Sequence, residues 1–213
     1  MSALRVLRRL LRDSGAAVVV EIAVSMPLLM GLALVGMEVV NLATLHVRLN
    51  QLAITVADNA SRAKQAVSTG YPQFREYDVN QVFRGASIQV ENLNFPANGR
   101  VILSSLETNA SGGQWIHWQR CWGKNTYASL YGTQGTGATG TAFAGMGPTG
   151  SVMTAETGSA IMFVEVVYNY RPMFLTGVLG PVVIRKDAAL YVRDDRDLTA
   201  GVVATSGITT ATC

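Results

Sequence analysis

The 213 residues provide enough chain for one sizeable domain plus a further element, and only 15% of them are charged, against roughly 25% in soluble domains. The formal net charge of +3 comes from the first dozen residues, and the remainder is close to neutral. The positive charges in this first segment are Arg5, Arg8, Arg9 and Arg12, and the one acidic residue beside them is Asp13. A basic leader without a basic face predicts no nucleic-acid partner.

An almost unbroken apolar segment follows these arginines. In residues 16–43 only Glu21 and Glu38 are ionisable. A bilayer core of about 30 Å requires around 20 apolar residues in a helix, so we expect a leader over residues 1–16 and a transmembrane helix over 17–44. Because positive flanks stay in the cytoplasm, the N-terminus is predicted to be cytoplasmic and the rest of the chain exterior.

A secretory signal peptide also combines a basic region with an apolar core, but its small-residue cleavage site follows the core. Here the small residues Ser14, Gly15, Ala16 and Ala17 precede the core, and no convincing A-x-A pattern occurs after it. This order suits a prepilin-type leader peptidase, which cuts at the cytoplasmic face and leaves the apolar helix on the mature protein.

The basic leader, the Gly-Ala junction and the following "AAVVVEIAVSMPLLM" resemble the N-terminus of TadE-like minor pilins, or pseudopilins, of tight-adherence (Tad/Flp-type) pili. The resemblance covers about residues 12–45. It implies cleavage after a small residue, with a glutamate fifth in the mature chain and a proline shortly after, and Glu21 and Pro27 match these two positions. Cleavage after Ala16 makes Glu21 the fifth mature residue and cleavage after Gly15 makes it the sixth, and both bonds stay open.

Glu21 has a physical interpretation that does not depend on the family. A carboxylate in hydrocarbon costs at least about 2.5 kcal/mol and usually finds a partner. Cleavage creates an α-amine nearby, and we expect the amine of a neighbouring subunit to pair with Glu21; the alternative is a carboxylate solvated at headgroup level. Glu38, near the far end, is expected to be interfacial and solvated. Pro27 predicts a kink near Ala23, either as a bend needed for assembly or as a passive distortion.

The helix is expected to continue as an amphipathic stem over residues 45–70 and to stop at Gly70 and Pro72. Apolar residues recur at steps of three and four through Leu42, Leu45, Leu49, Leu52, Val56, Ala60, Ala63 and Val67. This stripe favours a core face under the C-terminal domain over a coiled coil.

Residues 71–213 predict a β-rich exterior domain, so the fold class is α+β: a long N-terminal helix with a mainly antiparallel, pilin-like sheet domain. A short helix is expected within residues 74–86. Alternating β-branched and aromatic residues predict strands at 87–93, 100–106, 113–122, 159–170 and 188–194. Asn98–Gly99 predicts a hairpin turn between the first two strands.

Cys121 and Cys213 lie 92 residues apart, which suits a disulfide in an oxidising compartment; two free thiols are the alternative. Several segments are assigned to structure and not to chemistry. We expect Trp115, Trp118 and Trp122 to pack in the core or at an edge, glycine-rich residues 132–150 to form a mobile loop, and residues 193–197 to form a solvated turn. The apolar stretch 172–184 is either core or a partner surface.

No catalytic residue, cofactor or metal site is expected, because His46 and His117 belong to no ligand motif and neither cysteine has a partner histidine. The sequence therefore predicts a structural minor pilin in the bacterial inner membrane, with a periplasmic C-terminal domain and incorporation into a pilus. Its expected partners are the prepilin peptidase, other pilus subunits, the inner-membrane assembly platform and membrane lipid. The alternative is an unprocessed single-span anchor carrying an exterior binding domain.

Overall fold

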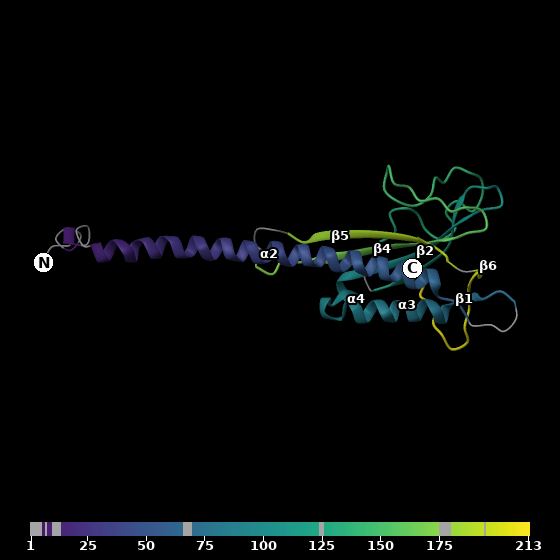
Figure 1. The fold of residues 1–213 in the computed structure, drawn as a ribbon, viewed down its shortest axis with the longest axis horizontal. Coiled ribbons are helices and arrows are strands. Elements are labelled where there is room, and N and C mark those ends of the chain that lie inside the picture. The colour runs from purple at the N-terminus through teal and green to yellow at the C-terminus, as the bar shows by residue number, and fades with distance from the viewer. Residues whose placement is uncertain are drawn as a thin grey trace. The chain divides into compact units, whose positions relative to one another are not determined.

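The computed structural model describes residues 6, 8–9, 14–65, 70–123, 126–174, 180–193 and 195–213 (Figure 1). Most of the predicted leader, Val67 of the stem and Asp194 lie outside the described residues. The chain divides into two compact units: Met1–Thr44 with Arg171–Gly180, and Leu45–Tyr170 with Pro181–Cys213.

The predicted long N-terminal helix is present as α2 (Ser14–Arg62), an uninterrupted helix of 49 residues. It ends earlier than the predicted stop at Gly70, because other groups bind its last carbonyls. Arg196 donates from Nη2 to the Ala60 carbonyl (2.9 Å) and from Nη1 to the Ala63 carbonyl (2.7 Å), and the Arg193 N–H donates to Ser61. These donors satisfy the carbonyls that a helix end leaves open, so no further turn is needed.

The predicted stripe on the second half of α2 is a core face. Its buried members are Leu45, Leu49, Leu52, Val56 and Ala60. Helix α3 (Glu76–Gln89) lies beside this part of α2 (Figure 1). A Cβ added at Gly85 of α3 would lie 3.9 Å from Nδ2 of Asn59 in α2. The interpretation as a core face is confirmed.

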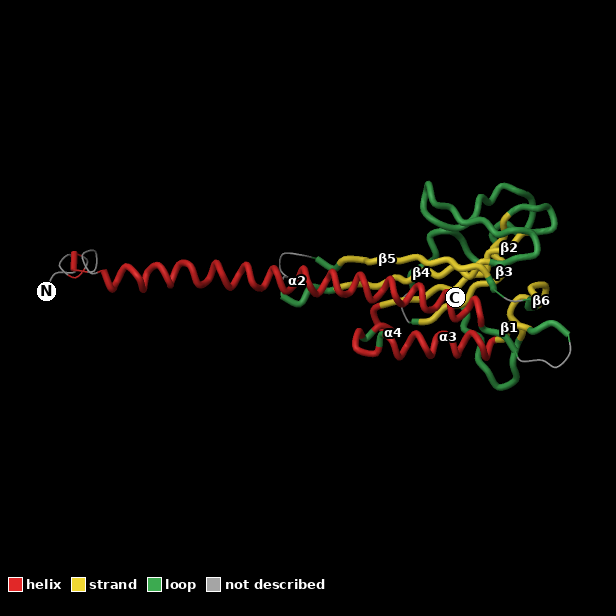
Figure 2. The backbone as a smooth tube through the Cα atoms, viewed as in Figure 1, coloured by secondary structure: helices red, strands yellow, loops and turns green. Residues whose placement is uncertain are grey.

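A four-stranded antiparallel sheet forms the centre of the second unit, in the order β3-β2-β4-β5 (Figure 2). The strands are β2 (Gly99–Thr108), β3 (Gln114–Trp122), β4 (Ile161–Tyr170) and β5 (Val182–Tyr191). The α+β prediction and the first three of these strands are confirmed. β5 begins earlier than the predicted strand at 188–194, so part of the apolar stretch 172–184 belongs to the sheet.

The strand predicted at residues 87–93 is wrong. These residues complete α3 and form the 3₁₀ turn η1 (Glu91–Leu93). The alternation of the sequence "SIQV" also fits a helix, because Val82, Ala86 and Val90 are buried at steps of four while Ile88 is exposed. A helical period over two turns outweighs a short local alternation.

The hairpin predicted at Asn98–Gly99 is also wrong. Asn98 ends the short helix α4 (Phe95–Asn98), and Gly99 begins β2 with an extended backbone. A Cβ at Gly99 would lie 2.6 Å from the Phe95 ring, so this glycine allows the close approach of the ring and is not a turn residue.

The connection between β3 and β4 packs over part of one face of the sheet, which we call the loop face, and contains the glycine-rich segment predicted to be a loop (Figure 2). Apolar residues of the strands and of the connection form one cluster: Leu106, Ile116, Ile161, Phe163, Met146 and Ala155. The Asn109 amide fastens the connection by donating to the carbonyls of Gly137 and Gly140, both at 2.7 Å.

The opposite face carries two stacked aromatic pairs that include tryptophans of β3. Phe74 of β1 (Gln73–Arg75) stacks on Trp118 with ring centroids 5.3 Å apart, and Phe95 stacks on Trp122 at 5.2 Å. β1 pairs in parallel with β6 (Asp197–Val203), a two-stranded sheet that was not predicted. Trp118 is buried and Trp122 half-buried, so both tryptophans pack against the fold as expected.

In the turn 193–197, Asp195 is exposed, and the Asp197 carboxylate accepts the Thr199 N–H (2.9 Å) and hydroxyl (2.6 Å). These hydrogen bonds lower the pKa of Asp197. Among the described residues no group of three or more His, Cys, Asp or Glu could hold a metal ion. Arg196 departs from the predicted solvated turn, because it is buried against the end of α2.

Candidate functional site

The first half of α2 is the candidate functional site. By length and composition, α2 is the one helix among the described residues that could cross a membrane. Its large apolar side chains are exposed on all sides: Val18, Val19, Val20, Ile22, Val24, Met26, Leu28, Leu29, Met30, Leu32, Leu34, Val35, Met37, Val39 and Val40. Such a continuous apolar surface indicates an environment other than water.

The predicted cleavage junction lies at the start of this helix. Gly15, Ala16 and Ala17 occupy the first turn of α2, and Gly15 and Ala17 are exposed. All three residues of the predicted junction are therefore helical.

Glu21 lies one turn further on and is exposed. None of the other described residues forms a hydrogen bond or ion pair with its carboxylate. Ala17 precedes it by four residues and shares its helix face. A mature chain that begins at Ala17 would therefore carry its own α-amine one turn from Glu21, in addition to the expected amine of a neighbouring subunit.

Pro27 lies inside α2, and the helix continues through it. Proline has no N–H, so the Ala23 carbonyl loses its usual partner. The Ser25 hydroxyl lies 3.5 Å from the carbonyl of Ile22, the residue before Ala23. The kink stays a prediction.

Glu38 differs from the sequence-based expectation, because it is not solvated. Its side chain is buried, and its carboxylate accepts the backbone N–H groups of Met173 (3.0 Å) and Phe174 (2.9 Å). The sequence offers one general reason to expect a partner, because a second acid in an apolar helix needs one, but no pattern in it identifies Met173 and Phe174.

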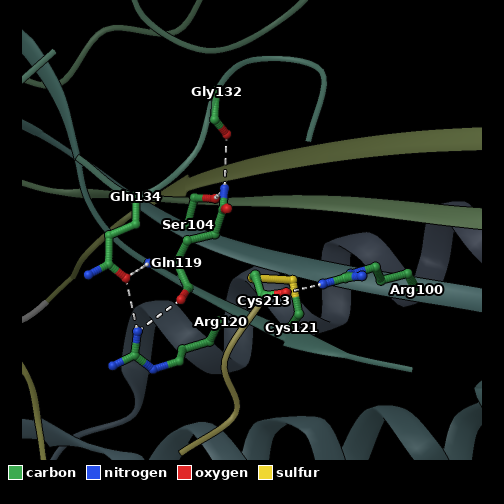
Figure 3. Close-up of a disulfide and its surroundings, with 8 residues drawn as sticks. All are labelled: Arg100, Ser104, Gln119, Arg120, Cys121, Gly132, Gln134 and Cys213. Carbon is green, nitrogen blue, oxygen red and sulfur yellow. Dashed lines mark hydrogen bonds between the residues drawn. A yellow bond between two sulfur atoms is a disulfide. The ribbon is translucent and has the colours of Figure 1, made fainter. Parts of the chain in front are cut away.

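The predicted disulfide joins Cys121 of β3 to Cys213, and Figure 3 shows it with its neighbours. Arg100 donates to the Cys213 carbonyl at 2.9 Å, and the Cys121 N–H donates to the Ala211 carbonyl at 2.8 Å. The C-terminal segment is thus fixed to the sheet by a covalent bond and by hydrogen bonds.

One hydrogen-bonded set among the described residues contains the residue types of a nucleophilic triad: Ser105, Glu107 and His117. The Ser105 hydroxyl donates to Oε1 of Glu107 (2.6 Å), and Oε2 of Glu107 lies 2.9 Å from Nδ1 of His117, which stacks on Trp115. In a nucleophilic triad the serine bonds to the imidazole and the acid supports the imidazole from its other side. Here the acid lies between the two groups, so the histidine cannot take the serine proton directly.

Two further buried carboxylates contribute to the electrostatics of the second unit. Glu76 of α3 accepts a hydrogen bond from Nε of Arg120 at 2.7 Å. Glu165, on the loop face, accepts the Leu130 N–H at 2.9 Å. Burial raises the pKa of Glu165 above the ordinary carboxyl value, and the hydrogen bonds from Ser129 and Leu130 offset only part of this effect.

Comparison of the chain with protein-family models, with curated proteins and with solved structures found no significant match. The resemblance to TadE-like minor pilins therefore rests on the residues of the N-terminal segment themselves.

Proposed function

We propose that the protein is a structural minor pilin, or pseudopilin, of a tight-adherence pilus. A prepilin peptidase removes the basic leader after Gly15 or after Ala16, and the apolar part of α2 holds the mature chain in the inner membrane. The β-rich unit lies on the periplasmic side, where the Cys121–Cys213 disulfide forms. Other pilus subunits and the assembly platform are its partners.

Glu21 is the observation that carries this proposal. It is an exposed carboxylate on an apolar helix, without a partner among the other described residues. In hydrocarbon such a group costs at least about 2.5 kcal/mol, so it favours any assembly that supplies a positive charge. The α-amine that cleavage creates supplies one: a chain that begins at Ala17 carries it one turn from its own Glu21, and a bundle of like helices also brings the amine of one chain to the acid of the next.

The contrast along α2 also supports the proposal. Residues 17–40 expose apolar side chains on all sides, whereas the stripe from Leu45 to Ala60 is already buried in the core of the second unit. The second half of the helix is therefore committed to its own domain, and the first half is available to lipid and to other helices.

Substitution of Glu21 tests the proposal. In Glu21→Ala and Glu21→Gln, we expect the protein to stay in the inner membrane and to disappear from filaments sheared from the cells, because both substitutions remove the charge. Glu156→Ala, which removes an exposed acid from the β3–β4 connection, is the matched control and should enter filaments normally. If both Glu21 variants enter filaments at the wild-type level, the unprocessed anchor with an exterior binding domain becomes the better explanation.

A further inference from the structure

The connection between β4 and β5 makes a specific contact with α2. Met173 donates its backbone N–H to Oε2 and Oε1 of Glu38 (3.0 and 3.3 Å), and Phe174 donates to Oε2 (2.9 Å). Both partners belong to the same unit, Met1–Thr44 with Arg171–Gly180. A carboxylate that accepts several N–H groups holds a loop firmly, since each bond is charge-assisted.

This contact hides polar groups and displays apolar ones. Glu38 is only 3% exposed, and it satisfies two backbone donors that hydrocarbon would leave without partners. The side chains of Met173 and Phe174 stay 67% and 45% exposed. Arg171, at the start of the connection, is exposed as well. The segment Arg171–Phe174, here called the β4–β5 tip, thus carries two exposed apolar side chains and one exposed arginine.

The position of Glu38 along α2 defines the level of this tip. Glu38 follows Glu21 by 17 residues, which is about 25 Å of helix at 1.5 Å per residue. The hydrocarbon core of a bilayer is about 30 Å thick. With Glu21 near the inner boundary, Glu38 and the tip lie near the outer boundary, beside the exposed apolar residues Leu34 and Val35, which precede Glu38 by one turn on the same helix face.

We propose that the β4–β5 tip is an interfacial membrane anchor. Met173 and Phe174 insert into the outer boundary of the bilayer beside α2, Arg171 binds lipid phosphate, and Glu38 holds the tip at that depth. Lipid fits better than a protein partner because the exposed apolar pair is continuous with the apolar surface of α2 and has a phosphate-binding side chain at its edge. This inference rests on the membrane span in the proposed function.

Single-cysteine labelling of the full chain tests the anchor. Both native cysteines are in the disulfide, so an introduced cysteine is the only thiol under non-reducing conditions. Phe174→Cys marks the tip, Leu29→Cys marks the middle of the apolar helix, and Ile88→Cys marks an exposed position on α3. Each variant carries an environment-sensitive fluorophore in phosphatidylethanolamine–phosphatidylglycerol vesicles that contain lipids spin-labelled at a shallow or a deep acyl position.

We expect shallow spin labels to quench the Phe174 probe, deep ones to quench the Leu29 probe, and neither to quench the Ile88 probe. Adding Glu38→Ala should abolish quenching at Phe174 and leave Leu29 unchanged. Glu38→Gln keeps one acceptor oxygen and should retain most of the quenching.

Three results would overturn the anchor. If the Phe174 probe is quenched no more than Ile88 while Leu29 is quenched, the tip lies outside the bilayer although the span is correct. If the Phe174 emission shifts only as the protein-to-lipid ratio rises, without lipid quenching, the tip contacts another protein chain. If Leu29 is not quenched either, the membrane span itself fails, and the proposed function fails with it.

Discussion

Replacing Arg196 with methionine should destabilise the second unit strongly, because this arginine ends α2. Its guanidinium donates to the carbonyls of Ala60 and Ala63 and lies 4.7 Å from the centre of the Phe74 ring. Hydrogen bonds that involve a charged group contribute about 1.5–3 kcal/mol each, and a desolvated cation–π contact adds about 1–2 kcal/mol. Because such terms are not additive and methionine keeps part of the packing, we expect a loss of about 3–5 kcal/mol.

Urea unfolding of the full chain in detergent, followed by tryptophan fluorescence, measures this loss. All three tryptophans lie in β3, so the signal reports on the second unit. With a urea m value of about 2 kcal/mol/M, the midpoint should fall by about 2 M.

The matched control is Arg193→Met, which removes an exposed arginine from the connection between β5 and β6, where Arg196 also lies. Its guanidinium lies 3.8 Å from Asp58, and an exposed pair of this kind contributes less than about 1 kcal/mol. The reasoning is refuted if Arg196→Met lowers the midpoint no more than Arg193→Met does.

Three further predictions concern the same unit. Reducing the Cys121–Cys213 disulfide should lower the free energy of unfolding by about 4–5 kcal/mol, because the bond closes a loop of 92 residues, and urea midpoints with and without reductant measure it. Arg120→Met should cost about 3–5 kcal/mol by leaving the buried Glu76 unpaired, whereas a cost under about 1 kcal/mol would contradict that account. Because burial raises the pKa of Glu165, the folded protein holds this proton more tightly than the unfolded chain. The contribution of Glu165 to stability should therefore fall as the pH rises above the ordinary carboxyl value of 4.5. Urea midpoints measured from pH about 4 to 7 should fall less steeply in Glu165→Gln than in the wild-type protein.

The parts of the fold that the sequence predicts correctly are those in which local periodicity and burial agree. The apolar run of α2, the stripe from Leu45 to Ala60 and the β-branched strand β4 each carry one pattern over many residues. The disulfide was predictable because the two cysteines of the chain have one pairing available.

The errors occur where a distant contact decides the local structure. Residues 87–93 alternate over too few positions to separate a strand from the end of a helix, and burial of Val82 and Val90 on one side of α3 decides it. The end of α2 depends on Arg196, more than 130 residues away, and no local signal marks that contact. The parallel pairing of β1 with β6 joins a three-residue strand to the far end of the chain, which periodicity cannot detect.

Within the candidate site, the junction and Glu21 stay predictions, and the structure corrects the placement of Glu38. Glu38 appeared solvated because it lies near the end of an apolar helix, where headgroups normally accept a charge. Its partners are backbone N–H groups of Met173 and Phe174, which no side-chain pattern encodes. Backbone donors of a distant loop can therefore satisfy an acid in an apolar helix without a residue pattern that identifies them.

The most direct test of the proposed function is the intact mass and N-terminal sequence of the protein recovered from bacterial membranes under non-reducing conditions. A mature chain that begins at Ala16 or Ala17 is the predicted result, because a prepilin peptidase cuts before the apolar helix and leaves it on the protein. A chain that still begins at Met1 or Ser2 would contradict the pilin proposal and would leave a plain membrane anchor.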